Sequence, residues 1–89
     1  MSHQLRADVT CCDTDDGLVL LDGRRGRYWQ LNTTGATILH ALLDGATPQH
    51  IARQLSQKLP VTPQQATHDV DHLIDQLTHA QLLQQEAVT

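Results

Sequence analysis

The hydrophobic pattern of this chain changes its period once, close to Leu31, and this change limits the folds open to it. Before Leu31 the apolar residues stand in short runs rich in β-formers, bounded by Asp and Gly. After Leu31 they recur every three or four residues, as on one face of an α-helix. Strands followed by helices predict an α+β domain, in which the helices cover one face of an antiparallel sheet.

Three short strands are expected, at residues 5–12, 18–22 and 27–31. The segments between them, 13–17 and 22–26, are rich in Asp and Gly, and Gly tolerates the positive φ that tight turns need. Connections this short join neighbouring antiparallel strands. The sequence therefore predicts a three-stranded antiparallel meander.

Capping residues and prolines mark the first two helices. Asn32 or Thr33 can cap the first helix, which should end at Gly45. Thr47-Pro48 opens the second helix and Pro60 stops it. The residues expected to face the core are Ile38, Leu39, Leu42 and Leu43 in the first helix, and Ile51, Ala52, Leu55 and Leu59 in the second.

The third helix is expected to be the longest, at about 18 residues or roughly 27 Å. It opens at Thr62-Pro63, where Gln65 completes a capping box. After it, a short tail at residues 82–84 should pack back on the fold, and the final residues should fray. The apolar positions of the helix, spaced by three and four, are Ala66, Val70, Leu73, Ile74, Leu77 and Ala80.

At 89 residues the chain is expected to form a single domain over residues 1–89. Aromatic residues make up only 2%, the adjacent Tyr28 and Trp29, so aliphatic side chains must fill the core. No apolar run is long enough to span a membrane, and the first residues lack the features of a secretion signal. We therefore expect a cytoplasmic protein, with the neighbouring Cys11 and Cys12 as reduced strand residues.

The formal charge of −4 argues against a nucleic-acid partner, because such binding relies on Lys and Arg to neutralise phosphates. Four of the six basic residues precede residue 30. The helical half has only Arg53 and Lys58. We expect neither nucleic acid nor a membrane as a partner. The acidic residues of the helical half are Asp44, Asp69, Asp71, Asp75 and Glu86.

No serine, cysteine or carboxylate stands in a recognisable catalytic motif, and the scattered glycines form no phosphate loop. His68 and His72 lie one turn apart on the third helix and could together ligate a metal. Asp71 or Asp75 could add a third ligand, but the spacing matches no known site. Two solvated polar residues are the simpler interpretation. The chain is expected to be no enzyme and to hold neither a cofactor nor a metal.

The third strand holds both aromatic residues. Side chains alternate along a strand, so Tyr28 and Gln30 should face one side and Arg27, Trp29 and Leu31 the other. One ring should pack under the helices while the other stays exposed; alternatively, both rings fill a small core. If this strand is a sheet edge beside an amphipathic helix, its unpaired main-chain groups could accept another chain.

An ordered set of short motifs extends over residues 5–84 and resembles the PqqD-like family. Members of this family are RiPP recognition elements, which bind the leader segments of ribosomally made, post-translationally modified peptides. The resemblance implies a winged helix-turn-helix-like fold. The matching segments are LLD at 20–22, GRYWQLNTTG at 26–35 and LDGATP at 43–48, with Ile51, Ala52, Leu55, Asp69, Val70, Leu73 and Leu77.

In the family, the leader adds as an antiparallel strand to the third strand and lies against the third helix. The resemblance therefore implies two groups of site residues in this sequence. For main-chain pairing these are Arg27, Tyr28, Trp29, Gln30 and Leu31. For the wall formed by the helix they are Asp69, Val70, Leu73, Ile74 and Leu77.

The stand-alone length and the segments LNTTG and LLDGATP resemble the discrete lasso-peptide members of the family. This likeness implies that the chain delivers a precursor to a separate leader peptidase, a transglutaminase-like cysteine protease, with the lasso cyclase as a further partner. A PqqD-type peptide chaperone for a radical SAM enzyme is an alternative. A winged-helix DNA-binding protein is another, because the architecture is shared and a fold does not determine a function.

Overall fold

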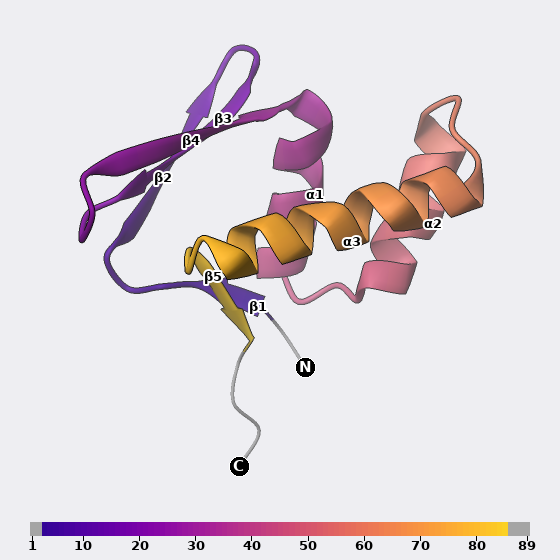
Figure 1. Cartoon of the computed structure of the whole chain (residues 1–89). Helices are drawn as coiled ribbons and strands as arrows, with labels where there is room; N and C mark the ends of the chain where they lie inside the picture. The colour runs from indigo at the N-terminus through magenta and orange to yellow at the C-terminus, as the bar shows by residue number, and fades with distance from the viewer. Residues whose placement is uncertain (1–2, 86–89) are drawn as a thin grey trace.

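A three-stranded sheet is followed by three helices, and a second, two-stranded sheet joins the ends of the described chain (Figure 1). The computed structural model describes residues 3–85. The predicted α+β fold, with a three-stranded antiparallel sheet followed by three helices, is confirmed. The elements are β1 (His3–Leu5), β2 (Val9–Thr14), β3 (Gly17–Asp22), β4 (Arg27–Asn32), α1 (Thr33–Leu43), α2 (Pro48–Lys58), α3 (Pro63–His79) and β5 (Leu83–Gln85).

The main sheet has the strand order β2-β3-β4, so β4 is one of its edges. Both pairings are antiparallel, with Thr14 opposite Gly17 and Asp22 opposite Arg27 across the two turns. Gly17 has a φ of +149°, and a Cβ there would lie 2.0 Å from the carbonyl oxygen of Leu31, so this position requires glycine. Among the described residues, no strand pairs with the outer edge of β4.

The predicted first strand, residues 5–12, is divided between the two sheets. β1 pairs with β5, whereas β2 pairs with β3. The break lies at Arg6, whose amide donates to the carbonyl oxygen of Leu82 (3.0 Å) and whose own carbonyl accepts from the amide of Val9 (3.0 Å). The prediction of one strand was wrong because the partner of β1 lies at the other end of the sequence, where a local pattern does not reach.

The tail that was expected to pack back forms β5. Leu82 and Leu83 are buried, and β5 runs antiparallel to β1. Figure 1 shows this pair of strands beside the C-terminal end of α3, so the small sheet closes the fold at that end. The prediction that the last residues fray concerns residues 86–89, which lie outside the described part of the chain.

Each helix begins at a side-chain cap that the sequence indicates. Asn32, Thr47 and Thr62 each accept a hydrogen bond from the backbone amide three residues later, at 2.8, 3.2 and 3.1 Å. Gly45, with a φ of +96°, follows α1 as the predicted left-handed terminator. The three helix starts are therefore determined locally.

The core is aliphatic, as the composition requires, with one correction. Leu59, expected on the apolar stripe of the second helix, is 38% exposed. It lies beyond α2 in extended backbone (φ −120°, ψ 153°), because the residue before a proline, here Pro60, is disfavoured in helical conformation. The buried apolar residues are Leu18, Leu20, Ala36, Ile38, Leu39, Leu42, Ile51, Ala52, Leu55, Ala66, Val70, Leu73, Leu77, Ala80, Leu82 and Leu83.

Two further sequence expectations concern the surface. Cys11 and Cys12 are free cysteines in β2, the first partly buried and the second exposed, as expected for strand residues. None of the helices in residues 3–85 combines the length and the apolar character that crossing a bilayer requires.

Candidate functional site

A groove separates the outer edge of β4 from α3. α3 packs on α2 and β5, whereas the helix that packs against β3 and β4 is α1. The strand and the long helix therefore face each other without filling the space between them. Two adjoining pockets lie along this groove.

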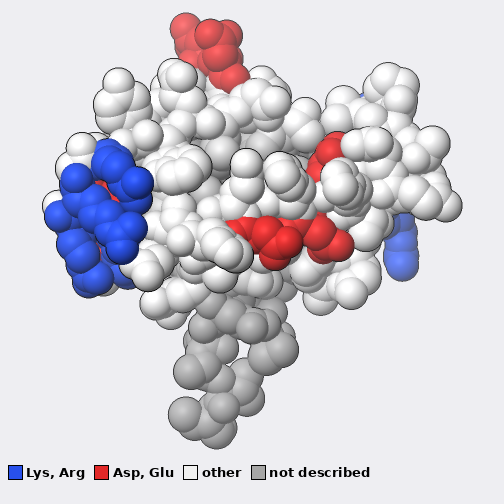
Figure 2. Space-filling view, viewed as in Figure 1, with Lys and Arg blue, Asp and Glu red and all other residues white. Residues whose placement is uncertain are grey.

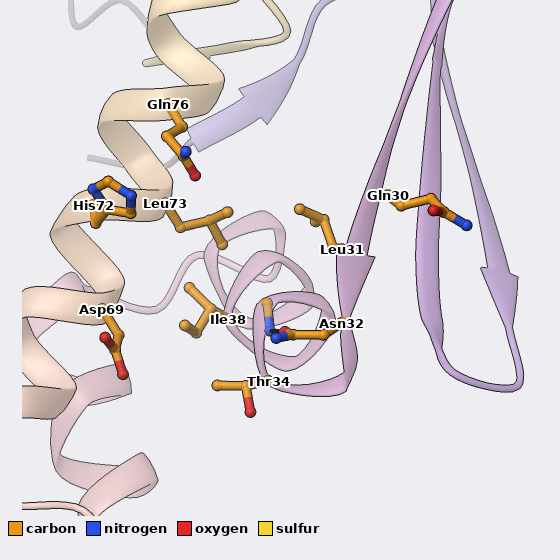
Figure 3. Close-up of a pocket in the computed structure, with 10 residues that line it drawn as sticks. Gln30, Leu31, Asn32, Thr34, Ile38, Asp69, His72, Leu73 and Gln76 are labelled. Carbon is orange, nitrogen blue, oxygen red and sulfur yellow. Dashed lines mark hydrogen bonds between the residues drawn. The ribbon is translucent and has the colours of Figure 1, made fainter.

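The first pocket has a volume of about 400 Å³ and lies at the C-terminal end of β4. Figure 3 shows Leu31 of β4 and Leu73 of α3 pointing toward one another across it, with Ile38 of α1 nearby. These three side chains give the pocket an apolar floor. Its other lining residues are polar or small and form the rim: Gln30, Asn32, Thr34, Gly35, Asp69, His72 and Gln76.

The second pocket, of about 410 Å³, lies at the other end of β4, next to the β3–β4 turn. Trp29 and Ala80 supply its apolar surface, and Arg25, Arg27 and His79 supply charge or polarity. Gln76 lines both pockets, so the two adjoin beside α3 and are together called the groove.

The side chains of β4 alternate as the sequence predicts. Trp29 and Leu31 are half-buried and pack against the core, whereas Tyr28 is 70% exposed. In Figure 3 the side chain of Gln30 points away from the groove, opposite to Leu31. The two faces of the sheet beside this edge therefore differ: Trp29 and Leu31 lie on one face, and Tyr28 lies on the other.

The residues predicted for the helix wall fall into three groups. Asp69 and Leu73 line the first pocket. Val70 and Leu77 are 0% and 1% exposed, so they belong to the core behind the groove. Ile74 is half-buried against the core and lines neither pocket, because the rotation of 100° per residue puts it on the other flank of the buried stripe.

The side of α3 that lines the groove includes three residues that the sequence interpretation missed: His72, Gln76 and His79. They follow Asp69 at intervals of three and four, which puts them on the same face of the helix. That spacing was visible in the sequence. The missing information was which flank of the apolar stripe faces the strand.

Asp69 stands at the start of the groove-lining face. Its carboxylate accepts a hydrogen bond from the side-chain amide of Gln65 at 2.9 Å. The predicted capping box is therefore half formed: Thr62 caps the helix, but the side chain of Gln65 is directed to Asp69 instead of back to the cap residue.

The two histidines considered as metal ligands lie next to each other on α3. His72 lines the groove, and the ring of His68 stacks on it with 6.0 Å between ring centroids. Within the part of the chain that the structure describes, no three His, Cys, Asp or Glu side chains are grouped closely enough to hold a metal ion.

A buried carboxylate fixes the turn beside the second pocket. Asp22 is fully buried, and its Oδ1 accepts from the backbone amides of Arg24 (3.0 Å) and Arg25 (3.3 Å) and from the guanidinium of Arg6 (2.5 Å). Burial acts to raise the pKa of Asp22, but these donors outweigh it and hold that pKa below its ordinary value. The guanidinium of Arg6 also lowers the pKa of Asp8, to which it donates.

The same cluster connects the turn to the end of α3. Arg6 donates from Nη1 to the carbonyl oxygen of Gln81 (2.6 Å), and Arg25 donates to the Gln81 side chain (2.5 Å). Gln81 has a φ of +63°, so the chain reverses direction there. The β3–β4 turn and the C-terminal end of α3 are therefore linked by side-chain hydrogen bonds beside the second pocket.

Three comparisons with known proteins bear on this site. The family model of coenzyme PQQ synthesis protein D (PqqD) matches residues 17–83, which include all of β3, β4 and the three helices. No curated protein sequence matches the chain significantly.

Two solved structures are similar to this one. The first, described as lasso peptide synthetase B1 complexed with the leader peptide, is 38% identical over 96% of this chain and 100% of that chain, with a TM-score of 0.90. The second, TbiB1 in complex with the TbiA(β) leader peptide, is 25% identical over 96% of this chain and 99% of that chain, with a TM-score of 0.83. Both relatives were solved with a leader peptide.

Proposed function

Since this chain belongs to the PqqD family, we propose that it binds the leader segment of a ribosomally made precursor peptide by adding it as a strand to β4. The identification as a PqqD-like RiPP recognition element is confirmed by the family match and by the two similar structures. The observation that carries the proposal is the groove, in which an unpaired strand edge lies beside an apolar pocket.

Two kinds of contact contribute to binding. The outer edge of β4 offers main-chain donors and acceptors, which favour any extended peptide and carry little sequence information. The pocket floored by Leu31, Ile38 and Leu73 selects an apolar side chain, and burying one of leucine size contributes about 1.5–3 kcal/mol. Together these contacts offset the conformational entropy that a flexible leader loses when it is ordered.

The precursor class follows from the relatives. Both similar structures hold a leader peptide, and the one described as lasso peptide synthetase B1 matches this chain over nearly its full length. These matches support a lasso-peptide precursor, whereas the family model alone equally supports a PqqD-type chaperone for a radical SAM enzyme. The chain in this proposal is a non-catalytic partner.

The bound precursor is then presented to a separate leader peptidase of the transglutaminase-like cysteine protease type, with the lasso cyclase as a further partner. Holding the precursor and the peptidase in one complex raises their effective concentration and so favours cleavage without any chemistry by this chain. β4 and α3 engage the leader, and the rest of the surface stays available for the peptidase.

Trp29 provides a direct test, since it is the only tryptophan and lies in the groove. Titrating the protein with the leader peptide of the lasso peptide synthetase B1 complex, and with the leader of a precursor encoded beside this chain, should change its emission in a saturable way. A scrambled leader is the control. Unaltered emission together with no heat of binding at saturating leader would contradict the proposal.

Presentation is tested with the peptidase. Adding the chain should lower the KM for precursor cleavage while leaving the cleavage site unchanged, because its contribution is to concentrate the substrate. The KM for a core peptide without its leader should not change when the chain is added. If the purified peptidase cuts the precursor equally fast with and without this chain, leader binding would stand but presentation would fail.

A further inference from the structure

The charges along the groove point to a preferred leader sequence, and this inference rests on the proposed function. We infer that the groove selects a leader in which an apolar residue is followed, two or four positions later, by an acidic residue. The apolar side chain occupies the pocket of Leu31, Ile38 and Leu73, and the acidic one lies against Arg25 and Arg27.

The first observation is that two arginines of the second pocket have no acidic partner among residues 3–85. The ion pairs of residues 3–85 are formed by Arg6, Arg24 and His40, and none involves Arg25 or Arg27. Both residues line the pocket beside Trp29, and Arg25 is held there by its hydrogen bond to Gln81. A carboxylate brought to this place would meet two guanidinium groups.

The second observation is that the opposite charge lies at the other end of the groove. Asp69 lines the first pocket, and its carboxylate accepts a hydrogen bond from the neutral side-chain amide of Gln65. Figure 2 shows basic atoms gathered at the end of the molecule where Figure 1 has the β3–β4 turn, and acidic atoms along the middle, where α3 runs. The groove is therefore electrostatically polarised along its length, and a peptide with acidic and basic residues exchanged is repelled.

The third observation gives the spacing. Arg27, Trp29 and Leu31 are successive residues on one face of β4, each pair separated by about 6.6–6.8 Å. Residues of an added strand lie opposite them with the same spacing. A leader side chain opposite Leu31 enters the first pocket, and the side chains opposite Trp29 and Arg27 are two and four positions away.

The fourth observation gives the direction. Every strand pairing in the structure's main sheet is antiparallel, and antiparallel pairing is slightly more stable per residue than parallel pairing. β4 runs from Arg27 toward Asn32, so an antiparallel leader runs from the Asn32 end to the Arg27 end. The apolar residue therefore comes first in the leader and the acidic residue follows.

A phage library of random linear peptides, selected on the immobilised full-length protein, tests this order. We expect an enriched motif with an apolar residue followed by Asp or Glu two or four positions later. Selection on Arg27→Glu should replace that acidic residue by Lys or Arg. The matched control is Arg53→Glu, the same charge change at an exposed position on α2 outside the groove, which should enrich the wild-type motif.

Binding of a synthetic peptide from the selection gives the magnitude. Arg27→Glu should weaken it about tenfold, since one attraction becomes a repulsion, and a peptide with Lys at the acidic position should recover most of the loss. Thermal melts verify that both variants fold.

The outcomes separate the inference from the proposed function. Enriched peptides that compete with a leader but show no acidic preference, or show the same preference on Arg27→Glu, would overturn the inference alone. An acidic residue enriched before the apolar one would overturn the assigned direction and with it the inference. No enrichment and no leader binding would overturn both.

Discussion

At the scale of single residues, the two flanks of α3 differ in which side chains line the groove proposed for the leader. Leu73 and Ile74 are neighbours in sequence, yet Leu73 lines the first pocket and Ile74 lies on the other flank, against the core. The sequence pattern treated them as equivalent members of one apolar stripe. The residues of α3 that line the first pocket are Leu73, Asp69, His72 and Gln76.

This difference gives a matched pair of substitutions. Leu73→Ala removes part of the pocket floor and should weaken leader binding about tenfold, whereas Ile74→Ala should leave affinity unchanged within about twofold. Both truncations lower the melting temperature, because both side chains contact the core. Titration by Trp29 emission at a temperature where both variants are folded measures the affinities, and an equal loss for the two would refute the assigned flank.

At the scale of elements, the proposed strand addition depends on the edge of β4. A bare strand edge tends to pair with other chains, and here Tyr28 is exposed on one face while Trp29 and Leu31 are half-buried on the other. Because the two faces differ, a shift of one residue in the register of an added strand would place each of its side chains on the wrong face. The register of an added strand is therefore determined by its side chains as well as by its main chain.

Proline at Gln30 tests the use of this edge, because proline removes the amide while the side chain of Gln30 points away from the groove. With that amide at the outer edge, Gln30→Pro should weaken leader binding about tenfold or more and leave the melting temperature close to that of the wild type. Gln30→Ala keeps the amide and should bind normally. A folded Gln30→Pro protein with wild-type affinity would show that the leader does not pair with β4 at this position.

At the scale of the whole molecule, the cluster of Arg6, Asp22 and Gln81 joins the N-terminal segment, the β3–β4 turn and the end of α3. Its members come from three distant parts of the chain. The cluster connects the β3–β4 turn to the end of α3, so long-range polar contacts, as well as the apolar core, position the two sides of the groove.

The lowered pKa of Asp22 gives this cluster a pH dependence. A carboxylate whose pKa is lower in the folded protein stabilises it fully above the ordinary value of 3.8, and this stabilisation is lost as the pH falls through the lower, folded-state pKa. Asp8 contributes in the same direction. The melting temperature should therefore fall as the pH drops below about 4.

Asp22→Asn isolates the effect. The variant should melt at a lower temperature than the wild type at neutral pH, and the gap between the two should narrow as the pH falls, because the wild type loses the same charge interaction. Melting curves over the acidic range measure this gap. A gap that stayed constant with pH would show that the carboxylate's charge does not contribute to stability.

The local pattern of the sequence was sufficient for β3, β4, the three helices and their order, but not for the division of the first strand into β1 and β2 or for the strand β5. Short β-rich runs, capping residues and prolines affect only the backbone a few residues away. Asn32, Thr47 and Thr62 could therefore be recognised as helix caps from the sequence. The alternation that exposes Tyr28 and half-buries Trp29 is equally local, since it follows from the period of a strand.

Only the tertiary structure decided what depends on distant residues. The pairing of β1 with β5, the burial of Asp22 under Arg6, and the flank of α3 that faces β4 each join segments far apart in the chain. An apolar stripe shows that a helix is buried but not which neighbour lies on either side of it. The groove is a property of two such neighbours at once, and for that reason it appears only when the chain is folded.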